Sequence, residues 1–77
     1  MKIQILGGGC AKCHALAQHA EAAAKDLGLD YQMEKITDMN RYADFGVAMT
    51  PALAVDGVVK VVGKVASVDE IKTLLKG

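Results

Sequence analysis

The sequence predicts an α/β fold with the element order β-α-β-α-β-β-α, in which a four-stranded mixed sheet is flanked by helices. Three observations support this fold class. Apolar residues recur at helical spacing between residues 10 and 27. Two runs rich in β-branched residues are joined by Asp56-Gly57. Ser67 stands three residues before Glu70 and an apolar pattern, which is the spacing of a capping box.

The first strand and the first helix follow from the pattern of apolar residues. Residues 2–6 form a short apolar run that ends at three consecutive glycines. We expect a helix from Cys10 or Ala11 to Leu27, because its apolar residues are three or four positions apart: Leu16, Ala20, Ala24 and Leu27. Gly28 follows where a left-handed residue commonly ends a helix.

A second strand and a short second helix come next. Residues 30–36 alternate between apolar and polar well enough for a strand. Thr37 or Asp38 then begins a helix that runs through Phe45 and stops at Gly46. Residues at a spacing of three are expected to form the packed face of this helix: Met39, Tyr42 and Phe45.

A hairpin and a closing helix complete the chain. Residues 52–55 and 58–62 are joined by Asp56-Gly57, a strong hairpin signal because both turn positions favour positive φ. Ser67 and Glu70 cap a helix whose apolar residues are Ile71, Leu74 and Leu75. The helix after residues 2–6 permits a right-handed crossover, so the first two strands can pair in parallel. A mixed sheet with helices on both faces satisfies both constraints.

Composition narrows the class of protein. We expect residues 1–77 to form a single domain, because the chain has no room for a second. Nine basic and nine acidic residues are spread along the chain without a basic patch, which argues against nucleic acid as a partner. No apolar run approaches the ~20 residues that span a membrane, and residues 1–6 lack the features of a signal peptide. We therefore expect a soluble cytoplasmic protein, in which a catalytic disulfide is more usual than a structural one.

The only two cysteines, Cys10 and Cys13, lie at the junction of the first strand and the first helix. The backbone N–H groups and the dipole at a helix N-terminus stabilise an anion, so the Cys10 thiolate is favoured there. Two intervening residues place the Cys13 sulfur one helical turn away, close enough to form a disulfide. The pattern indicates dithiol–disulfide exchange, which requires no cofactor.

A Cys-x-x-Cys pair has three other common uses. Zinc needs about four ligands, and His14 and His19 lie five apart on one helix, so we expect no metal site. Cys10 to His14 also matches the pattern for c-type haem attachment, but the hairpin does not suit that class. The alternative function is a soft-metal module that binds copper or an arsenic-type ion through the dithiol. His19 is expected to face solvent.

A second motif, Gly46-Val47-Ala48-Met49-Thr50-Pro51-Ala52-Leu53, precedes the hairpin. With Cys10-Ala11-Lys12-Cys13 and the element order, it makes the whole chain resemble the small archaeal and bacterial thioredoxin-like proteins called redox-active disulfide proteins. The resemblance implies a thioredoxin fold and a thiol–disulfide oxidoreductase. It also implies that Pro51 is cis and packs beside Cys10, where the Thr50 backbone is presented to an extended segment of a partner.

In the resulting hypothesis, Cys10 is the thiolate that attacks a target disulfide and Cys13 resolves the mixed disulfide. Lys12 adds a nearby positive charge that favours the thiolate. Met49 lies just before Thr50-Pro51, where it offers an apolar contact for a partner. The expected partners are disulfide-containing proteins as substrates and a thioredoxin-reductase-like protein or another dithiol as reductant.

The chain departs from full-size thioredoxins at Gln4. Thioredoxins hold a buried acidic residue six positions before the first cysteine, and this chain has Gln4 there. An amide does not accept a proton at neutral pH, so any assistance to proton transfer from this position is absent.

Overall fold

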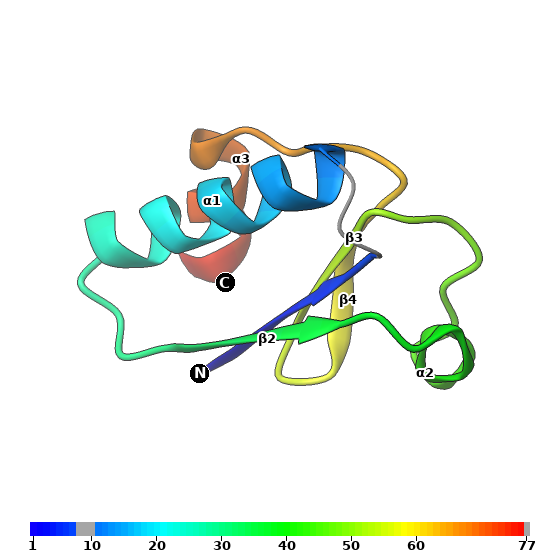
Figure 1. Ribbon diagram of the computed structural model, residues 1–77. Coiled ribbons are helices and arrows are strands. Elements are labelled where there is room, and N and C mark those ends of the chain that lie inside the picture. Colours follow the sequence, from blue (N-terminus) through cyan, green and yellow to red (C-terminus); the bar gives the residue numbers. More distant parts are fainter. Residues whose placement is uncertain (8–10, 77) are drawn as a thin grey trace.

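The computed structural model describes residues 1–7 and 11–76 (Figure 1). The order of its helices and strands is the predicted one, and their boundaries lie within about two residues of those predicted from the sequence. The elements are β1 (Lys2–Leu6), α1 (Ala11–Asp26), β2 (Gln32–Ile36), α2 (Met39–Asp44), β3 (Ala52–Val55), β4 (Val58–Val62) and α3 (Val68–Lys76).

The four strands form one mixed sheet in the order β2-β1-β3-β4. β1 is parallel to β2, with Ile3 opposite Met33, and antiparallel to β3, with Ile3 opposite Val55. β3 and β4 form the predicted antiparallel hairpin, with a bulge at Lys60, the residue of β4 that has no partner between Leu53 and Ala54. The parallel and antiparallel pairings expected from the connections are therefore both present.

Helices lie on both faces of this sheet. α1 and α3 lie side by side over one face, and α2 lies near the C-terminal end of β2 (Figure 1). Buried residues from α1, α3 and the sheet form the first core cluster, which includes Ile3, Ile5, Leu16, Leu53 and Ile71. The second cluster is smaller and consists of Leu6, Ile36, Val47, Ala52 and Ala54, with Tyr42, Phe45 and Val59 packed against it.

The predicted packed face of α2 is wrong at Met39, whose side chain is 78% exposed. Tyr42 and Phe45 do pack against the second cluster. An α-helix has about 3.6 residues per turn, so each step of three falls about 60° short of a full turn. Met39 and Phe45, the residue that caps α2, are therefore about 120° apart around the axis, so Met39 lies off the side on which Phe45 packs against the second cluster.

The hairpin turn is fastened to β1 as well as to its own strands. Asp56 and Gly57 have φ values of 50° and 84°, as a turn of this type requires. The Asp56 side chain accepts a hydrogen bond from the Lys2 N–H (2.7 Å), and the Gln4 side chain accepts one from the Gly57 N–H (2.9 Å). These contacts join the turn to the middle of the sheet.

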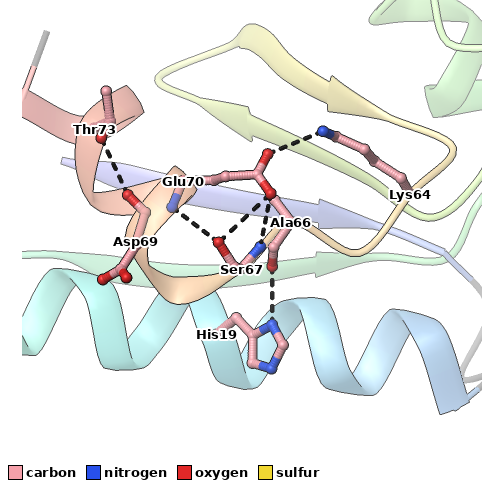
Figure 2. A network of polar contacts seen from close by, with 7 residues as sticks. All are labelled: His19, Lys64, Ala66, Ser67, Asp69, Glu70 and Thr73. Carbon is pink, nitrogen blue, oxygen red and sulfur yellow. Dashed lines mark hydrogen bonds and ion pairs between the residues drawn. The ribbon is translucent and has the colours of Figure 1, made fainter.

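α3 begins with the predicted capping box (Figure 2). The Glu70 N–H donates to the Ser67 hydroxyl at 3.1 Å, and the Glu70 carboxylate accepts from the Ser67 N–H at 3.5 Å. The same carboxylate forms an ion pair with Lys64 at 2.9 Å. The Lys64 ammonium and the Ser67 N–H together hold the pKa of the Glu70 carboxyl below its ordinary value of 4.5.

The expectation that His19 faces solvent is wrong. His19 is half-buried, and its Nδ1 lies 2.9 Å from the Ala66 carbonyl oxygen (Figure 2). The segment that leads into α3 passes over α1 at this point, so the imidazole links α1 to that segment. The pattern of α1 alone does not reveal a neighbour so distant in sequence.

Among the described residues, no helix is both long enough and apolar enough to cross a membrane.

Replacing the capping hydroxyl should weaken the fold measurably. Ser67→Ala removes the acceptor for the Glu70 N–H and is expected to cost about 1 kcal/mol, which lowers Tm by roughly 4–8 °C in a domain of this size. Thermal unfolding followed by circular dichroism measures the shift. Ser67→Asp retains a capping oxygen and should lose much less. Equal losses in the two variants would contradict the role of the cap.

The lowered pKa of Glu70 predicts a pH-dependent contribution to stability. A carboxyl whose pKa is depressed on folding stabilises the folded state above its unfolded pKa, and this contribution is lost as pH falls through the folded pKa. Urea unfolding of Glu70→Gln should therefore change less between about pH 6 and about pH 3 than that of the parent protein. Lys64→Ala should also reduce the change in stability between these two pH values, because it removes the ion pair that lowers the pKa of Glu70. An unchanged pH profile in Glu70→Gln would contradict the assignment.

Candidate functional site

Cys13 lies in the first turn of α1 and is 4% exposed. Its predicted partner Cys10 lies outside the described residues, directly before the start of α1 at Ala11. α1 begins here because alanine and leucine, which favour helix, follow a run of glycines, which do not. The second cysteine is thus held inside the protein at the N-terminal end of the longest helix.

The fold brings Cys13 together with two segments distant in sequence. A Cβ atom placed on Gly7 would lie 3.1 Å from the Cys13 Cβ and 3.8 Å from the Pro51 Cα, and it would collide with the Cys13 Sγ. The end of β1, the first turn of α1 and the residue before β3 therefore meet at one place. Two motifs separated by nearly forty residues, Cys-x-x-Cys and Thr-Pro, contribute to the same site.

Pro51 is buried, whereas Thr50 is exposed, and the peptide bond between them is cis. The Pro51 carbonyl accepts a hydrogen bond from the Gly63 N–H at 2.8 Å. Gly63 follows β4 with a φ of 73°, a conformation that residues with a Cβ seldom adopt. The turn after β4 thus anchors the proline segment through its backbone.

Met49 forms the exposed rim of the site. Its side chain is 62% exposed and lies against Gly63, where a Cβ atom would be 3.3 Å from the Met49 Cε and 3.8 Å from its Sδ. The structure thus places Met49 and Thr50 at the surface beside the buried Pro51 anchor. An exposed apolar side chain and an exposed neighbouring residue are available there together.

The charges of the first turn of α1 favour an anion. Lys12 and His14 are exposed, and the first turn of α1 contains no acidic residue. Negative charge at a helix N-terminus is stabilised by the dipole and the unpaired N–H groups. A thiolate next to this end of α1 is favoured for the same reason.

Gln4 has a structural role in this fold and not a role in proton transfer. It is 7% exposed, and its amide accepts from Gly57 and donates to the Glu34 carboxylate at 3.4 Å. The side chain therefore fastens the hairpin turn to β1 and β2. An amide fills this role without a charge that would have to be buried.

The described part of the chain contains no cluster of potential metal ligands. Within residues 1–7 and 11–76 no three His, Cys, Asp or Glu side chains lie close enough to hold an ion. His19 is engaged by Ala66, and His14 is exposed on α1.

Sequence reasoning missed Gly7 and Gly63 as residues of the site. Both are needed for close approach, Gly7 to Cys13 and Gly63 to Met49. The available signal was a glycine directly after each of the strands β1 and β4. That signal marks the end of a strand, but it does not say which side chain packs there.

Gly63→Ala should destabilise the protein and move Met49. A residue with a Cβ in the left-handed region costs about 1–2 kcal/mol, and the flexible end of Met49 must give way. Gly28→Ala is the matched control, because Gly28 has a φ of 67° and a Cβ added there would meet nothing within 4 Å. Urea unfolding should give similar losses, whereas the NMR signal of the Met49 methyl should shift in Gly63→Ala alone. A shift of equal size in both variants would contradict the contact.

Comparison with known proteins agrees with this architecture. The family model described as "Thioredoxin domain" matches residues 1–76. A relative from Methanothermobacter thermautotrophicus named thioredoxin is 49% identical over 75 residues, which cover 97% of each chain. A second protein of that name, from Methanocaldococcus jannaschii, is 42% identical over 74 residues, 96% of this chain and 85% of the relative. The resemblance expected from the motifs is confirmed: the chain belongs to the thioredoxin family.

Proposed function

We propose that the protein is a thiol–disulfide oxidoreductase that uses Cys10 and Cys13 as its redox pair. The observation that carries the proposal is the burial of Cys13 against Gly7, which in turn lies next to Pro51, at the N-terminal end of α1. Membership of the thioredoxin family supports the same chemistry. The assignment of individual roles follows from where each sulfur stands relative to α1.

Cys10 carries out the first step. It directly precedes α1, where the helix dipole and the exposed Lys12 favour the thiolate. The Cys10 thiolate attacks one sulfur of a target disulfide and forms a mixed disulfide. The other target sulfur leaves as a thiolate and takes up a proton from water. No net change in the number of disulfides occurs in this step.

Cys13 carries out the second step. Its thiol gives up a proton to solvent, and the thiolate attacks the Cys10 sulfur of the mixed disulfide. A Cys10–Cys13 disulfide forms and the second target sulfur is released. The target has then gained two electrons and the protein has lost two. Burial suits this role, because a shielded sulfur reacts with its neighbour in preference to a second target.

A reductant must return the two electrons before the next cycle. We propose a thioredoxin-reductase-like protein or another dithiol, which reduces the Cys10–Cys13 disulfide by the same exchange in reverse. The substrates are disulfide-containing proteins. Met49 and Thr50 are exposed beside Pro51 and supply the contact surface for an extended segment that carries the target disulfide.

A redox titration tests the function directly. Purified protein is equilibrated in defined thiol–disulfide buffers, alkylated and weighed by mass spectrometry. A reversible loss of two protons localised to Cys10 and Cys13, with a midpoint within roughly −270 to −120 mV, is expected of an exchange catalyst. Thiols that never pair, or that arrive occupied by copper or another soft metal, would overturn the proposal in favour of a metal-binding module.

The two cysteines should fail in different ways. Cys13→Ser should still form the mixed disulfide but release the second product at least about 100-fold more slowly, because an intramolecular thiol acts at a very high effective concentration. Cys10→Ser should not form the mixed disulfide. Non-reducing mass spectrometry after mixing with a disulfide-linked peptide separates these outcomes. Accumulation of the mixed disulfide in Cys10→Ser instead would reverse the two roles.

A further inference from the structure

We propose that Gly7 is a positioning residue for the Cys13 thiol. Because it has no side chain, it leaves open the space in which the Cys13 sulfur lies. The inference rests on the proposed role of Cys13 as the thiol that resolves the mixed disulfide. It adds a residue outside both motifs, on a different element of the fold.

The Gly7 backbone is held in place by the sheet. Gly7 is buried, and its N–H donates to the Ile36 carbonyl at 3.0 Å, which extends the parallel pairing of β1 and β2 by one residue. A Cβ on this fixed backbone would collide with the Cys13 Sγ and lie 3.1 Å from the Cys13 Cβ. The same Cβ atom would lie 3.8 Å from the Pro51 Cα, which is an ordinary contact. The conflict is therefore with Cys13 and not with the proline.

Cys13 has little freedom to avoid such a Cβ atom. Its side chain turns about a single bond with three staggered positions, one of which is rare in helices. Rotation would aim the sulfur elsewhere and would still leave the two Cβ atoms too close. Moving the backbone instead requires a shift of α1, which is held by the fully buried Leu16 and Ala20. Either response displaces the sulfur from its present place.

Displacement of this sulfur affects one step of the proposed cycle. Disulfide formation requires a narrow range of Cβ separations and torsions, and attack requires the sulfurs to be aligned. The first step, by Cys10 on the target, does not use Cys13. Gly7→Ala should therefore slow resolution selectively and leave formation of the mixed disulfide largely unchanged.

Stopped-flow reaction with dithiobis(nitrobenzoate), an aromatic disulfide that releases a coloured thiolate, resolves the two steps. Attack by Cys10 releases one thiolate at a rate proportional to reagent concentration. Attack by Cys13 on the resulting mixed disulfide releases a second thiolate at a rate independent of it. In Gly7→Ala the second release should slow by about tenfold or more, since a misplacement of about 1 Å can cost on the order of 10²-fold in rate. The first should change by less than about twofold, because Cys10 alone carries it.

Ile71→Val is the control for loss of stability, because Ile71 on α3 is fully buried in the first core cluster, to which Cys13 does not belong. It should lower the unfolding midpoint without changing the ratio of the two rates. An unchanged second release in Gly7→Ala, or equal slowing of both releases, would overturn the inference. A second release in the parent protein that scales with reagent concentration would instead overturn the proposed function.

A pair of variants tests the contact without relying on activity. Gly7→Ala should lower the unfolding midpoint less in a Cys13→Ala background than in the parent, because the sulfur that meets the new Cβ is gone. If Gly7→Ala alone does not fold but the double variant does, that outcome also supports the contact between residue 7 and the Cys13 sulfur. Equal losses in both backgrounds, or failure of the double variant to fold, would show that Gly7 is needed for another reason.

Discussion

The pairing of β1 on both of its edges is the constraint on which the site depends. β1 is hydrogen-bonded to β2 on one side and to β3 on the other. Its C-terminal end therefore cannot drift, and neither can Gly7, which continues the ladder to Ile36. β3 begins directly after Pro51, so the same pairing also fixes the proline segment. The buried cysteine packs against the first of these stretches at Gly7, and Gly7 lies next to Pro51 in the second.

The core that supports this arrangement is built with small side chains. The chain has no Trp and only three aromatic residues, and much of the buried surface of α1 is alanine: Ala17, Ala20, Ala23 and Ala24. Alanine lets α1 lie close to the sheet and to α3 and favours the helix itself. Close approach is also what places the first turn of α1 directly against the end of β1. The composition and the geometry of the site thus have a common origin.

Local patterns in the sequence predicted most of the fold. The hairpin turn at Asp56-Gly57 and the cap at Ser67 depend on residues next to one another in the chain, and both are present. The errors at Met39 and His19 arose where the outcome depends on distant neighbours or on a helix too short to bury a full stripe. For the site, the two motifs could be identified, but the contact of Gly7 with Cys13 depends on tertiary packing that no local pattern encodes. Cys10 lies outside the described residues, and its role stays a prediction.

The bulge in β4 bears on whether the exposed edge of the sheet can pair with strands of other molecules. β4 is an edge strand, and Val58 and Val62 expose apolar surface along it. An open edge of this kind is a template for strands of other molecules. Lys60 interrupts the regular ladder at the middle of the strand and places an ammonium group there. A second copy cannot pair along the whole edge without bringing charges together or distorting its own backbone. A lysine and a bulge on an edge strand are both features that disfavour such pairing.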